Sequence, residues 1–153
     1  MVKGNSSKII ALAIYAGAMA VVEAAAVVYL RELYYPSGFF ISSSADLSVL
    51  PAHILNVELW RETATIIMLS AVAYLAFITR KLRLLAFLWA FAVWDLAYYL
   101  FLYLFLKWPP TLGAMDVYFL IPRVWIGPVW LPLTLSSIAA ISSLWFMLKL
   151  KDK

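Results

Sequence analysis

Four long apolar stretches dominate the chain, and the segments between them hold most of its charged residues and prolines. The stretches cover about residues 9–30, 54–78, 84–106 and 129–148. An α-helix needs ~20 apolar residues to cross the hydrocarbon core of a bilayer. Each stretch is long enough, so the pattern predicts an all-α integral membrane protein. We expect one domain, residues 1–153, that forms an antiparallel bundle of four transmembrane helices.

The composition agrees with the membrane class. Of the 153 residues, 66% are hydrophobic and 13% are charged, whereas soluble domains are about 45–50% apolar and about 25% charged. The chain has no cysteine, which excludes thiolate metal sites and an iron–sulfur cluster held by this chain. It has a single histidine, His53, so one chain cannot hold a haem between two histidines.

The basic residues predict the orientation of the bundle. They gather before the first stretch (Lys3, Lys8), in the turn at 80–83 and after residue 148. Because cytoplasmic loops carry the excess of Lys and Arg, all three places are expected to face the cytoplasm. Both termini are then cytoplasmic, and residues 31–53 and 107–128 are external.

This orientation also suggests the setting of the protein. We expect the cytoplasmic (plasma) membrane of a prokaryote, with lipid as the main partner. A homo-oligomer and a complex with other membrane subunits both stay open. The sequence pI of about 9.4 follows from the terminal and loop basic residues, so it predicts no nucleic-acid partner.

The external segments are long for connections between packed helices. In the second, Thr111 is placed to cap a short interfacial helix that runs through Phe119 and ends before Pro122. Either segment could fold over the mouth of the bundle as a lid, and the simpler alternative is that both are interfacial loops.

Acidic side chains inside the apolar stretches are the strongest indication of function. They are Glu23, Glu58, Glu62 and Asp95. A carboxylate in hydrocarbon costs roughly 2.5–3.5 kcal/mol on insertion scales. Such groups therefore need protons, cations or positively charged partners.

Depth and helical spacing bring these acids together. At about 1.5 Å per residue from the basic ends, Glu23, Glu62 and Asp95 share one layer in the outer half of a ~30 Å core. Glu58 and Glu62 are four residues apart, so both lie on one helix face. The sequence therefore predicts an outward-facing polar pocket.

The charge balance limits what this pocket can hold. Four acids against Arg61 leave a charge of about −3 if all of them ionise, and such a remainder must be protonated or bound to cations. Three functional interpretations follow: a metal site, a proton relay, or a site for a cationic substrate. A purely structural network of salt bridges and hydrogen bonds is the alternative to all three.

We favour an intramembrane metal site with one or two ions, and the sequence does not decide whether it is catalytic. Bundle cores rich in carboxylates hold paired metals, although the usual Glu-x-x-His pairs are missing here. Manganese, zinc, iron or calcium would suit oxygen ligands. The expected ligands are Glu23, Glu58, Glu62, Asp95 and His53. The expected neighbours of the site are Arg61, Thr65, Tyr98, Tyr99, Asp116 and Arg123.

Two other functions stay open. Glu23, an acid embedded in the first of four helices, resembles the small multidrug resistance family, in which such a residue exchanges protons for cationic drugs. This chain departs from that family in its long external segments and additional acids. The resemblance implies a proton-coupled carrier of a cationic or small lipophilic substrate. The other possibility is a non-catalytic subunit of a larger membrane complex.

Overall fold

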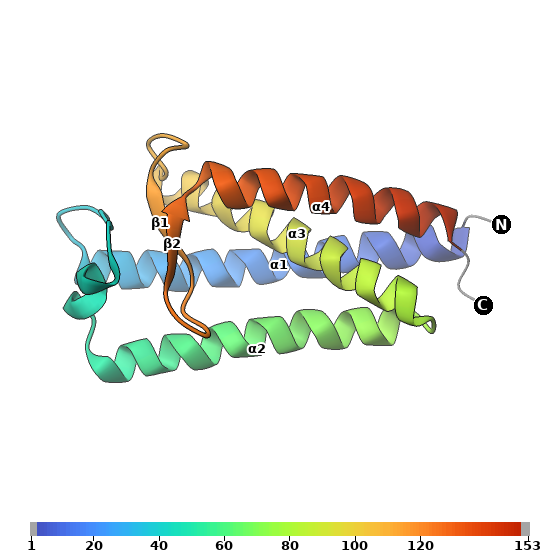
Figure 1. The fold of residues 1–153 in the computed structure, drawn as a ribbon, viewed down its shortest axis with the longest axis horizontal. Helices are drawn as coiled ribbons and strands as arrows, with labels where there is room; N and C mark the ends of the chain where they lie inside the picture. The colour runs from blue at the N-terminus through green and yellow to red at the C-terminus, as the bar shows by residue number, and fades with distance from the viewer. Residues whose placement is uncertain (1–2, 151–153) are drawn as a thin grey trace.

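A computed structural model describes residues 3–150 and shows four long helices with one short β hairpin (Figure 1). Lys151 and Lys153, which contribute to the predicted orientation, lie outside the described residues, as does the side chain of Lys3. The helices are α1 (Lys3–Tyr34), α2 (Ala52–Ala76), α3 (Arg80–Leu106) and α4 (Trp130–Lys149). The shorter elements are the 3₁₀ helix η1 (Ser44–Val49) and the strands β1 (Met115–Phe119) and β2 (Trp125–Pro128).

Three of these helices, α1, α3 and α4, are long and apolar enough to cross a membrane. The protein is therefore mostly helical and suited to a lipid bilayer. The remaining long helix, α2, has 25 residues but carries Glu58, Arg61 and Glu62 in its first half. These charges lower its hydropathy, which is the property that identifies a spanning helix.

Local sequence explains where the helices begin and end. Pro51 precedes the first turn of α2, where a missing N–H has no cost. The Thr79 side chain accepts a hydrogen bond from the Leu82 N–H at 3.4 Å and caps α3. At its other end α3 stops at Lys107, which has a left-handed backbone with φ of 53°. The chain then turns into the segment that contains the hairpin.

The start of α1 lies beside the end of α4 (Figure 1). The Asn5 side-chain amide donates hydrogen bonds to the carbonyls of Met147, at 3.2 Å, and Leu150, at 2.9 Å. In the same half of the bundle the Trp89 indole N–H donates to the Ile9 carbonyl at 3.1 Å and joins α3 to α1.

The β hairpin is the element that the sequence did not predict. Instead of a helix from Thr111 to Phe119, residues 115–119 form β1, which pairs with β2 in an antiparallel ladder. Val117, Tyr118 and Phe119 favour a strand because their side chains fit a pleated surface. A Cβ at Gly127 would collide with the Tyr118 hydroxyl, so glycine leaves room for the Tyr118 ring beside β2. The hairpin crosses the bundle from α4 towards α2 (Figure 1).

The packing differs along the bundle. Around the chain ends a cluster of buried apolar side chains includes Phe77, Leu82 and Met147. Ala16 and Ala20 of α1 are fully buried further along, in a cluster with Ala90 of α3, and small residues of this kind let helices approach closely. The half that contains the hairpin holds the buried charged residues of the described chain, which are Arg31, Glu62 and Asp116.

Candidate functional site

A cavity of about 370 Å³ lies in the half of the bundle that contains the hairpin. It is lined by α1, α2, α3, the start of α4, the hairpin and the segment that follows α1. Ligand sites typically measure about 300–1,000 Å³ and combine apolar walls with a few polar groups. The wall here is rich in aromatic side chains, which include Phe91, Trp94, Tyr98, Tyr99, Tyr118, Phe119 and Trp125.

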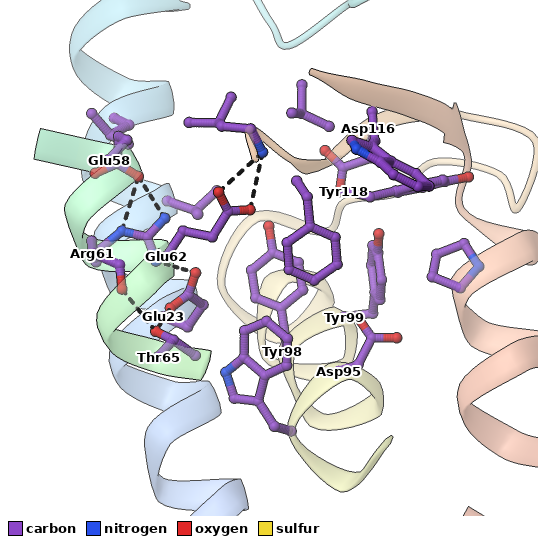
Figure 2. Close-up of a pocket in the computed structure, with 18 of the residues that line it drawn as sticks. Glu23, Glu58, Arg61, Glu62, Thr65, Asp95, Tyr98, Tyr99, Asp116 and Tyr118 are labelled. Atoms are coloured by element: carbon purple, nitrogen blue, oxygen red, sulfur yellow. Dashed lines mark hydrogen bonds and ion pairs between the residues drawn. The ribbon is translucent and has the colours of Figure 1, made fainter. Parts of the chain in front are cut away.

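Most of the residues selected from the sequence line this cavity, and several are drawn in Figure 2. Two do not. His53 is exposed near the start of α2, and Arg123 is exposed between the strands of the hairpin. Those that line it are Glu23, Glu58, Arg61, Glu62, Thr65, Asp95, Tyr98, Tyr99 and Asp116.

Arg61 connects two of the acids. Its Nε lies 2.9 Å from Glu58 Oε2, and its Nη1 forms an ion pair with Glu23 of α1 (Figure 2). The Thr65 hydroxyl donates to the other oxygen of Glu23 at 3.3 Å. One guanidinium therefore pairs with two carboxylates and joins α1 to α2, which lowers the cost of burying these charges.

Glu62 has a different partner. The Leu120 backbone N–H lies 3.0 Å from each of its two carboxyl oxygens, so Glu62 attaches the hairpin to α2 (Figure 2). Within residues 3–150, Arg61 pairs with Glu23 and Glu58 and no ion pair reaches Glu62. Glu62 is nevertheless buried.

Asp95 is the acid on α3. Its carboxyl accepts a hydrogen bond of 2.7 Å from the Ser136 hydroxyl and joins α3 to α4. As with Glu62, the described part of the chain provides no cationic partner for it. Two cavity carboxyls therefore rely on neutral hydrogen-bond donors.

Asp116, on β1, pairs with Arg31 near the end of α1. Arg31 Nη2 lies 3.1 Å from Asp116 Oδ1, and both side chains are buried. Burial raises the pKa of the Asp116 carboxyl, while the charge of Arg31 opposes this shift. Sequence reasoning included Asp116 among the neighbours of the site but did not pair it with Arg31. These residues are 85 positions apart, so no local pattern connects them.

Two tyrosines stand between these acids. Tyr98 and Tyr99 of α3 pack edge to face with ring centroids 5.0 Å apart, and Tyr98 stacks on Trp94 at 6.3 Å. Their rings lie between the level of Asp95 and that of the hairpin (Figure 2). The indole Nε1 of Trp94 is buried and has no hydrogen-bond partner among the described residues.

The predicted acids converge on one cavity but not on one point. Among residues 3–150, no three His, Asp or Glu groups lie close enough together to hold a metal ion. Metal binding therefore remains a prediction from the sequence.

Five acidic side chains and two arginines line the cavity, an excess of three acids. The arrangement suits a ligand that adds positive charge or displaces protons. Comparison of the chain with known protein families, curated proteins and solved structures finds no match.

Proposed function

We propose that this protein binds a small lipophilic cation in the cavity. The observation that supports this most directly is the pair Glu62 and Asp95. Both line the cavity, and neither has a cationic partner in the part of the chain that the structure describes. The other three acids share Arg61 and Arg31, so the two that remain are the groups beside which a bound cation would gain most.

The walls of the cavity support a ligand that is largely apolar. Trp94, Tyr98 and Phe119 belong to a surface on which an organic cation can rest, because the faces of aromatic rings attract positive charge. A small hydrated metal ion would gain little from such walls. A cation shielded by hydrocarbon gains both electrostatic attraction and burial of its apolar area.

Proton exchange follows from the same charges. A buried carboxyl with no positive partner favours its protonated form, because burial disfavours the charged form. An arriving cation reverses that preference. We therefore propose that Glu62 and Asp95 hold protons in the unliganded protein and that one of these protons is released when the cation binds. Coupled binding of this kind is the first requirement of a proton-linked carrier.

The metal-centre alternative would require larger rearrangement. Glu23 and Glu58 would have to leave Arg61, and Glu62 would have to leave the Leu120 N–H. Metal analysis of the purified protein tests it, together with the thermal midpoint measured with and without a chelator. We expect no stoichiometric manganese, zinc, iron or calcium and no change in midpoint. Bound metal with a chelator-dependent midpoint would favour the metal centre.

We propose further that α2 is the fourth transmembrane helix and that both ends of the chain are cytoplasmic. The partial balance of charge around Arg61 supports this, because paired charges are cheaper in a membrane than isolated ones. Reporters fused at Asp46 and at Lys153 should then lie on opposite sides of the membrane. Reporters on the same side would be incompatible with four spans.

The cation proposal is tested with tetraphenylphosphonium and the purified protein in lipid nanodiscs. Tryptophan fluorescence gives the affinity, and a pH indicator in weak buffer gives the protons released. The tetraphenylborate anion has nearly the same shape with the opposite charge, so it is the matched control ligand. We expect binding of the phosphonium only, with release of protons.

Two substitutions locate the effect. Asp95→Asn and Glu62→Gln should each weaken phosphonium binding at least tenfold, which corresponds to about 1.4 kcal/mol, and should reduce the protons released. Glu32→Gln is the matched control, because Glu32 is exposed and does not line the cavity. Equal binding of the two ions by the wild-type protein would overturn the proposal. Unchanged affinity in both cavity variants would do the same.

A further inference from the structure

We propose that Arg31 and Asp116 form a second recognition point in the cavity, which binds an uncharged group that both accepts and donates hydrogen bonds, such as a carboxamide. This inference rests on the proposed cation site and specifies its ligand further. The ligand would carry its positive charge towards Glu62 and Asp95 and the neutral polar group towards Arg31 and Asp116.

The hydrogen bonding of the pair is incomplete. Arg31 and Asp116 are buried, with exposed fractions of 6% and 2%. They are joined through one nitrogen and one oxygen, Nη2 and Oδ1, at 3.1 Å. Arg31 Nε and Nη1 and Asp116 Oδ2 have no hydrogen-bond partner of regular geometry in the described part of the protein. The Tyr99 hydroxyl interacts with the Asp116 carboxyl and opposes the rise in its pKa that burial causes, but it leaves Oδ2 without such a bond. Unpaired polar atoms at this depth are costly, and both side chains line the cavity.

The surroundings of Arg31 limit how a ligand can reach it. The guanidinium carbon lies 3.9 Å from the centroid of the Phe39 ring and 3.9 Å from that of Trp108. The two rings meet edge to face with their centroids 5.8 Å apart, so they cover adjacent sides of the guanidinium. A ligand gains most by approaching the N–H edge, where Nε and Nη1 have no partner among the described residues. A group at the edge must present a hydrogen-bond acceptor such as a carbonyl oxygen.

The net charge of the Arg31–Asp116 pair determines which charge the bound group of the ligand can carry. Arg31 and Asp116 already neutralise each other, so a further buried charge would lack compensation. An anion would be repelled by Asp116 and a cation by Arg31. A neutral carboxamide avoids both costs, because its carbonyl accepts from Arg31 and its amide N–H donates to Asp116 Oδ2.

The experiment compares three triphenylphosphonium ions that differ in one substituent: butyl, 3-carbamoylpropyl and 3-carboxypropyl. All three carry the same cation and a chain of similar length. We expect the carbamoyl ion to bind about tenfold more tightly than the butyl ion, which corresponds to about 1.4 kcal/mol. The carboxylate ion should bind more weakly than the carbamoyl ion. This comparison uses the wild-type protein and needs no variant to fold.

A double variant assigns the preference to the pair. Arg31→Met with Asp116→Leu replaces both charges by apolar groups of similar size, which proteins often tolerate. The variant should lose the preference for the carbamoyl ion, so that its affinities for the carbamoyl and butyl ions become equal. A tenfold preference retained in a folded double variant would refute the assignment.

The outcomes separate this inference from the proposed function. Equal affinity of the butyl and carbamoyl ions, with the effect of Asp95→Asn intact, would refute the second recognition point alone. Tighter binding of the carboxylate ion would also refute it, since the pair would then select an anion. Failure of all three ions to bind would overturn the cation site and, with it, this inference.

Discussion

The two halves of the bundle use the same helices for different purposes. In the half that holds the chain ends, buried residues such as Leu82, Ala86 and Met147 form an apolar core. In the other half α1, α2 and α3 surround a cavity with five carboxyls and two guanidiniums. The first half can gain stability from packing alone, whereas the second depends on each charge keeping its partner. Substitutions in the two halves should therefore destabilise the protein for different reasons.

The largest effect is expected at Arg61. Arg61→Leu leaves the partly buried carboxylates of Glu23 and Glu58 without their shared cation, and removal of one partner of a fully buried ion pair costs about 3–5 kcal/mol. Replacing Glu23, Glu58 and Arg61 together by leucine should recover most of this loss. Unfolding of the purified proteins in denaturing detergent measures the difference in the free energy of unfolding between the wild type, Arg61→Leu and the triple variant.

The control for Arg61 is Lys81→Leu, which removes an exposed cation and should change stability little. If the triple variant is as unstable as Arg61→Leu, uncompensated charge is not the cause of the instability.

A loss of about 2–5 kcal/mol is expected for Leu82→Ala in the apolar half, because it leaves a cavity among fully buried side chains. The apolar half should stabilise the protein without affecting ligand binding in the other half. Once folded, this variant should therefore bind tetraphenylphosphonium with wild-type affinity. Unfolding and binding measured on the same preparation test both statements. Weakened binding in the folded variant would show that the two halves are coupled.

Glu62 should show a smaller and more local effect. Glu62→Ala removes the acceptor of the Leu120 N–H, and an unsatisfied buried donor costs about 1–3 kcal/mol. Hydrogen exchange of residues 117–124 should accelerate, while exchange around Leu82 stays slow. Glu32→Ala, on an exposed position, is the control. Unchanged exchange in the hairpin would mean that Glu62 does not hold it.

The smallest effect concerns Asp46, outside the helices that span the membrane. Its carboxyl accepts hydrogen bonds from the Ser42 and Ser43 backbone N–H groups at 2.8 and 2.9 Å, which lower the pKa of Asp46. Because the pKa is lowered in the folded protein, the hydrogen bonds of the ionised Asp46 carboxyl contribute fully to stability above the ordinary carboxyl pKa of about 3.9. It is lost as the pH falls through the lower folded value.

The Ser42 and Ser43 amides should therefore lose their protection from hydrogen exchange as the pH is lowered below about 4. The Asp46→Asn variant should show no such dependence. Protection that persists equally in both proteins would mean that the carboxylate does not order this turn.

The sequence by itself determined the membrane class and the regions of the long helices, because hydrophobicity and its length along the chain are local properties. It also identified Glu23, Glu62 and Asp95 as residues that require polar partners, since an acid in an apolar stretch is costly wherever its partner lies. The depth of these residues along straight helices was enough to predict that they share one cavity.

Only the tertiary structure decided which group each acid meets. Residues 115–128 are too short and too rich in proline and glycine for their pattern to separate a helix from a hairpin. The pair between Arg31 and Asp116 spans 85 positions, and the attachment of Glu62 to the Leu120 N–H spans 58. Such contacts depend on how the helices and the hairpin pack in three dimensions, so no local rule of spacing contains them.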